Sequence, residues 1–146
     1  LDKTLIRYTD LVIPNETEAA SLTNEKPTTD LSIIEHTIYQ DLKAQGLNNV
    51  IITLGDKGVY YNVLNKSERL PIFKVNTLDT TAAGDTFIGT IISEIHTDFS
   101  NLEDVLLRSR IASSIAVSRE GAIASIPYRE DIVEQLAQRN ISAGVL

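Results

Sequence analysis

The N-terminal part of the chain alternates between a short apolar run and polar stretches. Residues 10–14 (DLVIP) form an apolar run that ends at Pro14, which predicts a buried strand. Polar residues 15–18 follow, ahead of apolar positions with helical spacing, and this order predicts a capped helix start. Residues 23–30 are polar and contain Pro27, so we expect a loop there.

The next part of the chain changes from helical spacing to short apolar runs. Apolar residues recur every four positions over 31–46, which predicts an amphipathic helix with Gly46 suited to its end. Pro71 lies within the last of the apolar runs and favours an edge position or a bend there. The runs that predict strands cover residues 49–54, 59–64 and 69–75.

Helical spacing dominates the C-terminal half. The sequence Ser100-Asn101-Leu102-Glu103 has the pattern of a capping box and predicts the start of a long helix that continues to about Val117. The other elements that we predict are a loop over 77–85, a helix over 84–95, a loop over 119–127 and a helix over 128–139.

The order of these elements predicts a layered α/β domain. Strands and helices alternate first and helices then dominate, which is typical of an α/β/α, Rossmann-like arrangement around a mainly parallel sheet. We find no internal repeat and no linker, so we expect residues 1–146 to form a single domain. Such sheets bind ligands at the carboxyl ends of their strands, where residues 15–18, 55–58 and 77–85 are expected to lie.

Composition narrows the classes of function. The net charge is −7 without a basic cluster, which argues against a nucleic-acid partner. The chain contains no cysteine, which excludes disulfides, thiolate metal sites and cysteine nucleophiles. Its longest apolar runs are far shorter than the roughly 20 residues of a membrane-spanning helix, and no secretory signal opens it. We therefore expect a cytoplasmic protein without a membrane partner.

Residues 79–85 (DTTAAGD) are suited to phosphate chemistry. Small side chains ahead of a helix leave backbone N–H groups open to an anion, and the helix dipole favours negative charge there. Asp85, in the first turn, is placed to accept the proton of a hydroxyl that attacks a γ-phosphorus. The same pattern is also typical of an ordinary loop with an acidic helix start, so the residues alone leave both interpretations open.

This segment resembles the signature D-T-x-G-A-G-D of the ribokinase family of carbohydrate kinases, also called the PfkB family. Ala82 stands at the usual glycine position. The resemblance implies that Asp85 is the catalytic base and that the backbone amides of Ala82, Ala83 and Gly84 form its anion hole.

Two earlier motifs resemble parts of the same family. Residues 14–18 (PNETE) resemble its N-x-x-E motif, which implies that Asn15 and Glu18 help to position Mg²⁺, mostly through water, and the nucleotide phosphates. An ordinary helix cap explains Asn15 and Glu18 equally well, and both roles are compatible. Residues 53–58 resemble the family's T-L-G-x-x-G turn, although a plain glycine turn would look the same. The resemblance assigns the nucleotide to Thr53, Leu54, Gly55, Asp56, Lys57 and Gly58.

A fourth block, residues 115–127, resembles the C-terminal stretch of ribokinases. In that family this loop and the D-T-x segment bind a monovalent cation, usually K⁺. The implied ligands are Asp79, Thr81, Ala116, Arg119, Gly121 and Ser125, with backbone carbonyls at Thr81, Ala116, Arg119 and Gly121. The residues alone are also compatible with a helix-ending loop that contains a glycine.

The resemblance extends from about residue 10 to residue 139 and corresponds to the C-terminal half of the family. Two positions depart from the pattern, Ile88 near the expected sugar pocket and Arg110 near the expected adenine site. We expect the lid, most sugar contacts and the homodimer interface of the parent protein to lie in an upstream half. We therefore expect the isolated chain to bind sugar poorly and to turn over slowly or not at all.

The resemblance implies an ATP-dependent sugar kinase with ATP, Mg²⁺ and K⁺ as its cofactors. The expected reaction is phosphorylation of D-ribose to ribose 5-phosphate. The alternatives are a sibling kinase for deoxyribose, fructose or a keto-deoxy sugar acid, a vitamin-type kinase of the same fold, and an inactive nucleotide-binding fragment.

Overall fold

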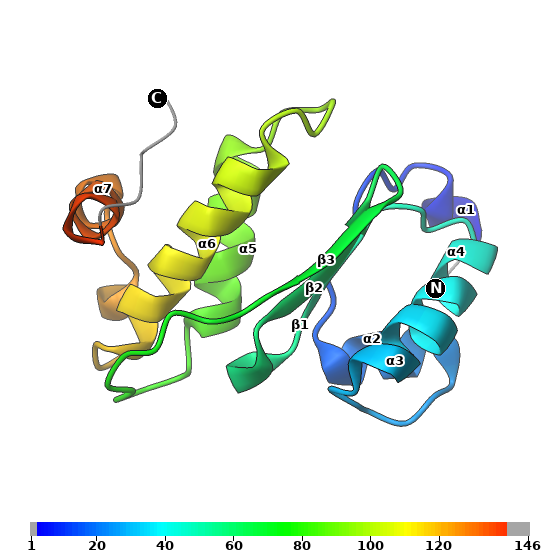
Figure 1. The fold of residues 1–146 in the computed structure, drawn as a ribbon, viewed down its shortest axis with the longest axis horizontal. Helices are drawn as coiled ribbons and strands as arrows, with labels where there is room; N and C mark the ends of the chain where they lie inside the picture. The colour runs from blue at the N-terminus through cyan, green and yellow to red at the C-terminus, as the bar shows by residue number, and fades with distance from the viewer. Residues whose placement is uncertain (1–2, 140–146) are drawn as a thin grey trace. The chain divides into compact units, whose positions relative to one another are not determined.

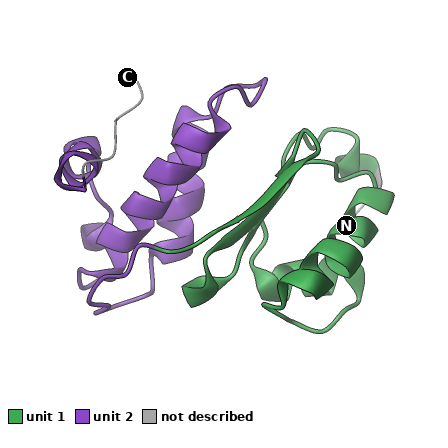
Figure 2. Cartoon of the chain, in the orientation of Figure 1, with its two compact units in different colours: residues 1–72 green, residues 73–146 purple. Residues whose placement is uncertain are grey.

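The computed structural model describes residues 3–139, and the chain divides into two compact units, 1–72 and 73–146 (Figure 2). The first unit contains the sheet and the helices that cover it, and the second contains helices only among the described residues (Figure 1). We describe each unit by itself. The single domain expected over 1–146 stays a prediction.

The sheet of the first unit has three antiparallel strands in the order β1-β2-β3. Parallel pairing within the described residues is limited to isolated bridges that join Val12 to Val50 and Asn15 to Thr53. The expectation of a mainly parallel sheet is therefore wrong for this part of the chain. The strands pair antiparallel because the connections between consecutive strands are short, whereas parallel neighbours need a long crossover. The strands are β1 (Val50–Thr53), β2 (Val59–Val63) and β3 (Lys66–Leu70).

Two of the predicted strands differ from those observed. Residues 10–14 form no strand but take part in the isolated bridges to β1, with the Val12 amide donating to the Asn49 carbonyl. The strand expected over 69–75 instead begins at Lys66 and ends at Leu70. Pro71 follows its last residue, since proline has no N–H to donate to a strand ladder.

Helices pack against one face of this sheet (Figure 1). The stripe of apolar residues predicted over 31–46 is confirmed, because Ile34, Ile38 and Leu42 are fully buried in a core shared with Ile52 and Tyr60. One turn of the helix is a π-helix, η1 (Ile34–Ile38), between α3 (Leu31–Ile33) and α4 (Tyr39–Ala44). The remaining α-helices among the described residues of the unit are α1 (Lys3–Ile6) and α2 (Glu16–Thr23).

The second unit is built from α5 (Ala83–Glu94), α6 (Leu102–Val117) and α7 (Arg129–Gln138). Helix α6 packs against both α5 and α7. Its contact with α7 buries Ile111, Ala112 and Ile115 against Ile132 and Leu136. The three helices predicted for this half are thus confirmed to within one or two residues at their ends.

The capping box predicted at residues 100–103 is wrong. Asn101 is the N-cap of α6, and its side chain makes no cap bond to the helix. Its amide oxygen instead accepts from the His96 amide at 2.9 Å, and its amide nitrogen donates to the Glu94 carbonyl at 2.8 Å. The side chain therefore closes the turn between α5 and α6. No helix of the described residues has both the length and the apolar character needed to cross a bilayer.

Candidate active site

In the first unit the structure brings two of the sequence motifs together. The segment that begins at Pro14 runs parallel to the end of β1, where Asn15 is bridged to Thr53. The Thr53 amide donates to the Pro14 carbonyl at 3.0 Å. The N-x-x-E segment and the T-L-G-x-x-G turn therefore lie side by side, held by backbone hydrogen bonds.

Asn15 and Glu18 form the capping box that the sequence allowed. The Glu18 amide donates to Asn15 Oδ1 at 2.8 Å, and the Asn15 amide donates to Glu18 Oε2 at 2.9 Å. This confirms the structural interpretation of the motif. Glu18 is exposed, so its carboxylate at the start of α2 also faces water. An exposed carboxylate fits Mg²⁺, which keeps several of its water ligands.

The glycine turn after β1 has a backbone that other residues cannot adopt easily. A short 3₁₀ helix, η2 (Gly55–Lys57), carries the chain round, and the Leu54 amide donates to the Gly58 carbonyl at 2.8 Å. Gly58 has φ of 97°, and a Cβ there would lie 2.1 Å from the Leu70 carbonyl oxygen. Only glycine allows β3 to pass this close.

The other residues of this turn differ in what they present to a ligand. The Leu54 side chain is buried in the core, so only its backbone is available. Asp56 and Lys57 are exposed and form an ion pair of 3.0 Å, which contributes little in water. Arg69 donates twice to the Lys57 carbonyl, at 2.9 and 3.2 Å, and so holds the turn against β3.

In the second unit the predicted anion site is the turn that opens α5. Gly84 and Asp85 are exposed, and no heavy atom lies within 4 Å of a Cβ built at Gly84. The Ala83 amide donates to the Thr80 carbonyl at 3.2 Å, whereas Ala82 is buried and caps the helix without a side-chain bond. The exposure of Gly84 and Asp85 and the open space at the Gly84 Cβ position are compatible with an approaching phosphate, and the Ala83 amide already has an acceptor.

Asp79 connects this turn to the loop after α6. Its carboxylate accepts from the Thr81 amide at 2.9 Å, the Thr81 hydroxyl at 2.5 Å and the Gly121 amide at 3.1 Å. These hydrogen bonds, the Thr81 hydroxyl first, hold the pKa of Asp79 below its ordinary value. The Leu78 and Asp79 amides also donate to the Val117 carbonyl, at 2.7 and 3.2 Å. Residues 79–81 and 116–121 thus lie together, which agrees with the arrangement that the family resemblance implies.

The other expected cation ligands lie in the same loop. The Ala116 carbonyl accepts from the Arg119 amide at 3.1 Å, at the end of α6. Gly121 has φ of 90°, and the short helix η3 (Ile123–Ser125) follows it. Ser125 is buried and donates its hydroxyl to the Ala122 carbonyl at 2.7 Å, which leaves its oxygen free to accept.

This donor set fits a hard monovalent cation. It consists of one carboxylate, one hydroxyl and several carbonyl oxygens, which are the groups that such ions prefer. Among the described residues no group of three or more His, Asp or Glu side chains could hold a metal ion. That observation does not bear on a site built mainly from carbonyls.

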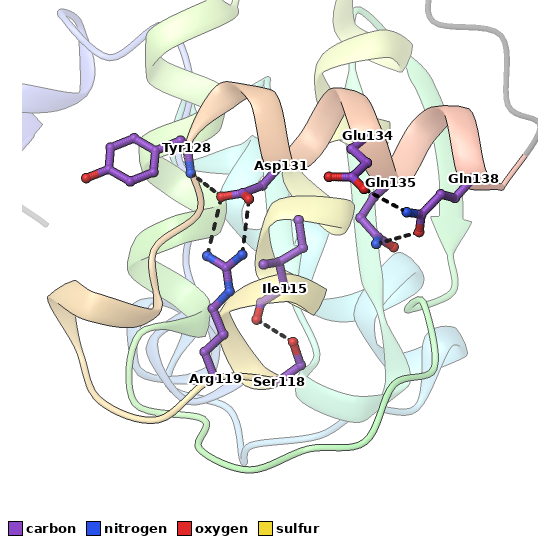
Figure 3. A network of polar contacts seen from close by, with 8 residues as sticks. All are labelled: Ile115, Ser118, Arg119, Tyr128, Asp131, Glu134, Gln135 and Gln138. Atoms are coloured by element: carbon purple, nitrogen blue, oxygen red, sulfur yellow. Dashed lines mark hydrogen bonds and ion pairs between the residues drawn. The ribbon is translucent and has the colours of Figure 1, made fainter.

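Sequence reasoning missed the side-chain role of Arg119. Its guanidinium makes a two-point contact with Asp131 on α7, at 3.2 and 3.4 Å (Figure 3). Asp131 also accepts from the Tyr128 amide at 2.8 Å and so caps α7. The spacing of Tyr128 and Asp131 could have predicted the cap of α7. No sequence pattern near Arg119 pointed to its contact with Asp131. The hydrogen bonds from Arg119 and Tyr128 lower the pKa of Asp131.

A cavity of about 280 Å³ lies beside this ion pair, within the second unit. It is lined by Val75, Ser114, Ile115, Ser118, Arg119, Asp131, Glu134 and Gln135.

Arg110, which departs from the family pattern, stacks on the Phe73 ring at 4.7 Å, and Arg139 lies at the same distance from that ring.

Known proteins similar in sequence to this chain are carbohydrate kinases. The model of the pfkB family carbohydrate kinases matches residues 2–129. Ribokinase of Staphylococcus aureus (strain COL) is 40% identical over 132 residues, which covers 90% of this chain and 43% of the relative. Deoxyribokinase of Salmonella typhi is 31% identical over 137 residues, which covers 94% of this chain and 44% of that protein. The chain thus spans less than half the length of these curated relatives.

Solved structures share the fold of this chain. Ribokinase of Arabidopsis thaliana, complexed with ribose and ATP, matches with a TM-score of 0.81 and 30% identity over 92% of this chain and 43% of that chain. An E. coli protein solved with ATP and Mg²⁺ matches with a TM-score of 0.72 and 26% identity, over 94% and 42%. The ribokinase-like fold class is therefore confirmed, and the antiparallel sheet corrects only the expected strand direction.

Proposed function

Because the chain belongs to the pfkB family of carbohydrate kinases, we propose that it carries the nucleotide-binding and phosphoryl-transfer part of an ATP-dependent sugar kinase. The observation that carries the proposal is the turn at the start of α5. There Gly84 and Asp85 are exposed in the first turn of the helix, and a Cβ at Gly84 would meet open space. Backbone N–H groups at such a turn stabilise the negative charge that develops on a transferred phosphoryl group.

The proposed reaction gives Asp85 the role of base and orienting group. The sugar hydroxyl oxygen forms a bond to the γ-phosphorus, the bond from that phosphorus to the bridging oxygen breaks, and ADP leaves. The hydroxyl proton passes to the Asp85 carboxylate. The backbone amides at Ala82–Gly84 supply the anion hole. Of these residues Gly84 is exposed and Ala82 is buried, and the Ala83 amide already donates to the Thr80 carbonyl.

The proposed cofactors are ATP with Mg²⁺ and a K⁺ ion. The proposed binding site for the nucleotide and Mg²⁺ consists of Asn15, Glu18 and the turn over 53–58. Its support is that one solved relative is a complex with ribose and ATP, and another is a complex with ATP and Mg²⁺. When bound, Mg²⁺ neutralises phosphate charge during the transfer. The K⁺ site would use Asp79, Thr81, Ala116, Arg119, Gly121 and Ser125. Its support is the hydrogen bonding that ties Asp79 to the Gly121 turn.

Ribose is the proposed substrate of the whole kinase. The ribokinase of S. aureus, at 40% identity, supports ribose over the deoxyribose of the more distant deoxyribokinase, at 31%. A panel of ribose, deoxyribose, fructose and keto-deoxy sugar acids, tested with a full-length kinase that contains this sequence, decides among them. A clear preference for any other sugar would contradict the ribose assignment alone. The cytoplasmic location and the homodimer remain predictions.

The nucleotide part of the proposal is tested by calorimetric titration of the 146-residue chain with Mg·ATP. We expect saturable binding that is lost without Mg²⁺, with little or no turnover of ribose in a coupled assay. Absence of nucleotide binding by a folded chain would contradict the proposal. Near full-length rates would contradict the expectation that the upstream half is needed for turnover.

A further inference from the structure

The turn that follows α6 is held by a second carboxylate besides Asp79. Arg119 Nη2 lies 3.2 Å from Asp131 Oδ1, and Arg119 Nη1 donates to Asp131 Oδ2 at 3.4 Å (Figure 3). The side chains are 39% and 31% exposed, so the pair is partly shielded from water. A planar guanidinium held at two points has little freedom to rotate, and this fixes direction as well as distance.

Asp131 is itself fixed in place. It lies in the first turn of α7, where it also accepts from the Tyr128 amide at 2.8 Å. Helix α7 packs on α6 through Ile132 and Leu136. The carboxylate that holds Arg119 therefore belongs to a packed helix and not to a mobile loop.

Arg119 lies in the middle of the turn that carries the proposed cation ligands. Its amide donates to the Ala116 carbonyl, and two residues later the Gly121 amide donates to Asp79. The turn 116–121 is thus tied to Asp79 on one side and to Asp131 on the other.

We propose that Asp131 is a positioning residue that, through Arg119, fixes the carbonyl oxygens of the turn 116–121 for a monovalent cation. This inference rests on the cation site of the proposed function. Ligands held in place before binding lose less entropy when the ion arrives. Release of Arg119 therefore weakens cation binding without removing any ligand atom.

The test measures thermal unfolding of the 146-residue chain as KCl replaces choline chloride at constant ionic strength. The half-saturating K⁺ concentration is compared for wild type, Arg119→Gln, Asp131→Asn and the double variant. We expect both single variants to raise it about tenfold, as is typical for a residue that orients a metal ligand. The half-saturating K⁺ concentration of the double variant should not exceed that of the single variant with the larger effect, because both changes break the same contact.

Two further variants separate positioning from helix capping. Asp98→Asn removes a charge from an aspartate in the loop between α5 and α6 of the same unit, which accepts from the Ser100 amide at 3.0 Å far along the chain from the turn. It should leave the K⁺ dependence unchanged. Arg119→Lys keeps the charge, loses the two-point contact and leaves the α7 cap intact, so it reports even if Asp131→Asn fails to fold.

Three results would overturn the inference. One is a lower unfolding temperature in both salts with an unchanged half-saturating K⁺ concentration. Another is an effect of Asp131→Asn that neither Arg119 variant reproduces, because Asp131 would then act only as a cap. The third is a wild-type chain that K⁺ does not stabilise over choline. That result would contradict the proposed cation site as well. The rest of the proposed function would still be tested separately by the measurement of nucleotide binding.

Discussion

Each of the two compact units positions its own candidate site residues, and the two do so by different physical means. In the first unit, backbone hydrogen bonds and a glycine do the positioning: Asn15 is bridged to Thr53, and Gly58 lets the Leu70 carbonyl approach. In the second unit, carboxylates do it: Asp79 holds the Gly121 amide, and Asp131 holds Arg119. Backbone pairing tolerates most side-chain changes but not the loss of a required glycine. A turn held by carboxylates depends on charge, on pH and on single side-chain atoms.

The largest expected effect falls on chemistry in the second unit. In a full-length kinase that contains this sequence, Asp85→Asn should lower kcat by roughly a hundredfold or more, because the amide cannot accept the hydroxyl proton. Asp85 is exposed, so the unfolding transition should change little. A coupled assay of ADP release measures the rate, with Asp98→Asn as the matched control. Activity within about tenfold of wild type would exclude Asp85 as the base.

The next effect falls on backbone geometry in the first unit. Gly58→Ala should destabilise that unit by roughly 2–4 kcal/mol, because the residue has positive φ and its Cβ would clash with the Leu70 carbonyl. Urea unfolding followed by circular dichroism measures the loss. Gly89→Ala, at an exposed position within α5 with nothing near its Cβ, is the control. It should stabilise by about 0.5–1 kcal/mol. Equal effects of the two changes would show that Gly58 has no special role.

The response to acid should separate the two units. The described carboxyl groups whose pKa is lowered by hydrogen bonds, Asp79, Asp98 and Asp131, all belong to the second unit. A lowered pKa in the folded state contributes stability above the unfolded value of about 4, and this is lost as pH falls through the folded pKa. The second unit should therefore loosen first on acidification.

The Gly121 amide reports this response directly, since it donates to Asp79. We expect its NMR chemical shift to titrate below about pH 4 in the wild-type chain. In Asp79→Asn that titration should be absent, and the amide should exchange faster with solvent. A Gly121 shift that titrates equally in both proteins would mean that the contact with Asp79 is not formed in solution.

The smallest effect is expected at the surface of the glycine turn. Asp56→Asn breaks an exposed ion pair with Lys57, and such pairs contribute little to stability. Urea unfolding should show no change within error. Arg69→Met, which removes two hydrogen bonds to the Lys57 carbonyl, should lower stability by about 1 kcal/mol. If Asp56→Asn lowered stability as much as Arg69→Met, side-chain charge would position the glycine turn of this unit as well.

The sequence by itself determined the local features and the family. The apolar stripe of Ile34, Ile38 and Leu42, the capping box of Asn15 and Glu18, and the helix that ends at Val117 all depend on residues within a few positions of one another. Such short-range patterns can be recognised from the sequence alone. The motifs of the family are equally local, and their order along the chain supported the assignment.

Only the tertiary structure decided which distant residues meet. The Asp79 carboxylate and the Gly121 amide are 42 positions apart, and no local pattern announces their hydrogen bond. The use of Asn101 to close a turn and the pairing of Arg119 with Asp131 depend on packing in the same way. Side-chain partners follow from which surfaces are buried together, and the sequence specifies those surfaces only indirectly.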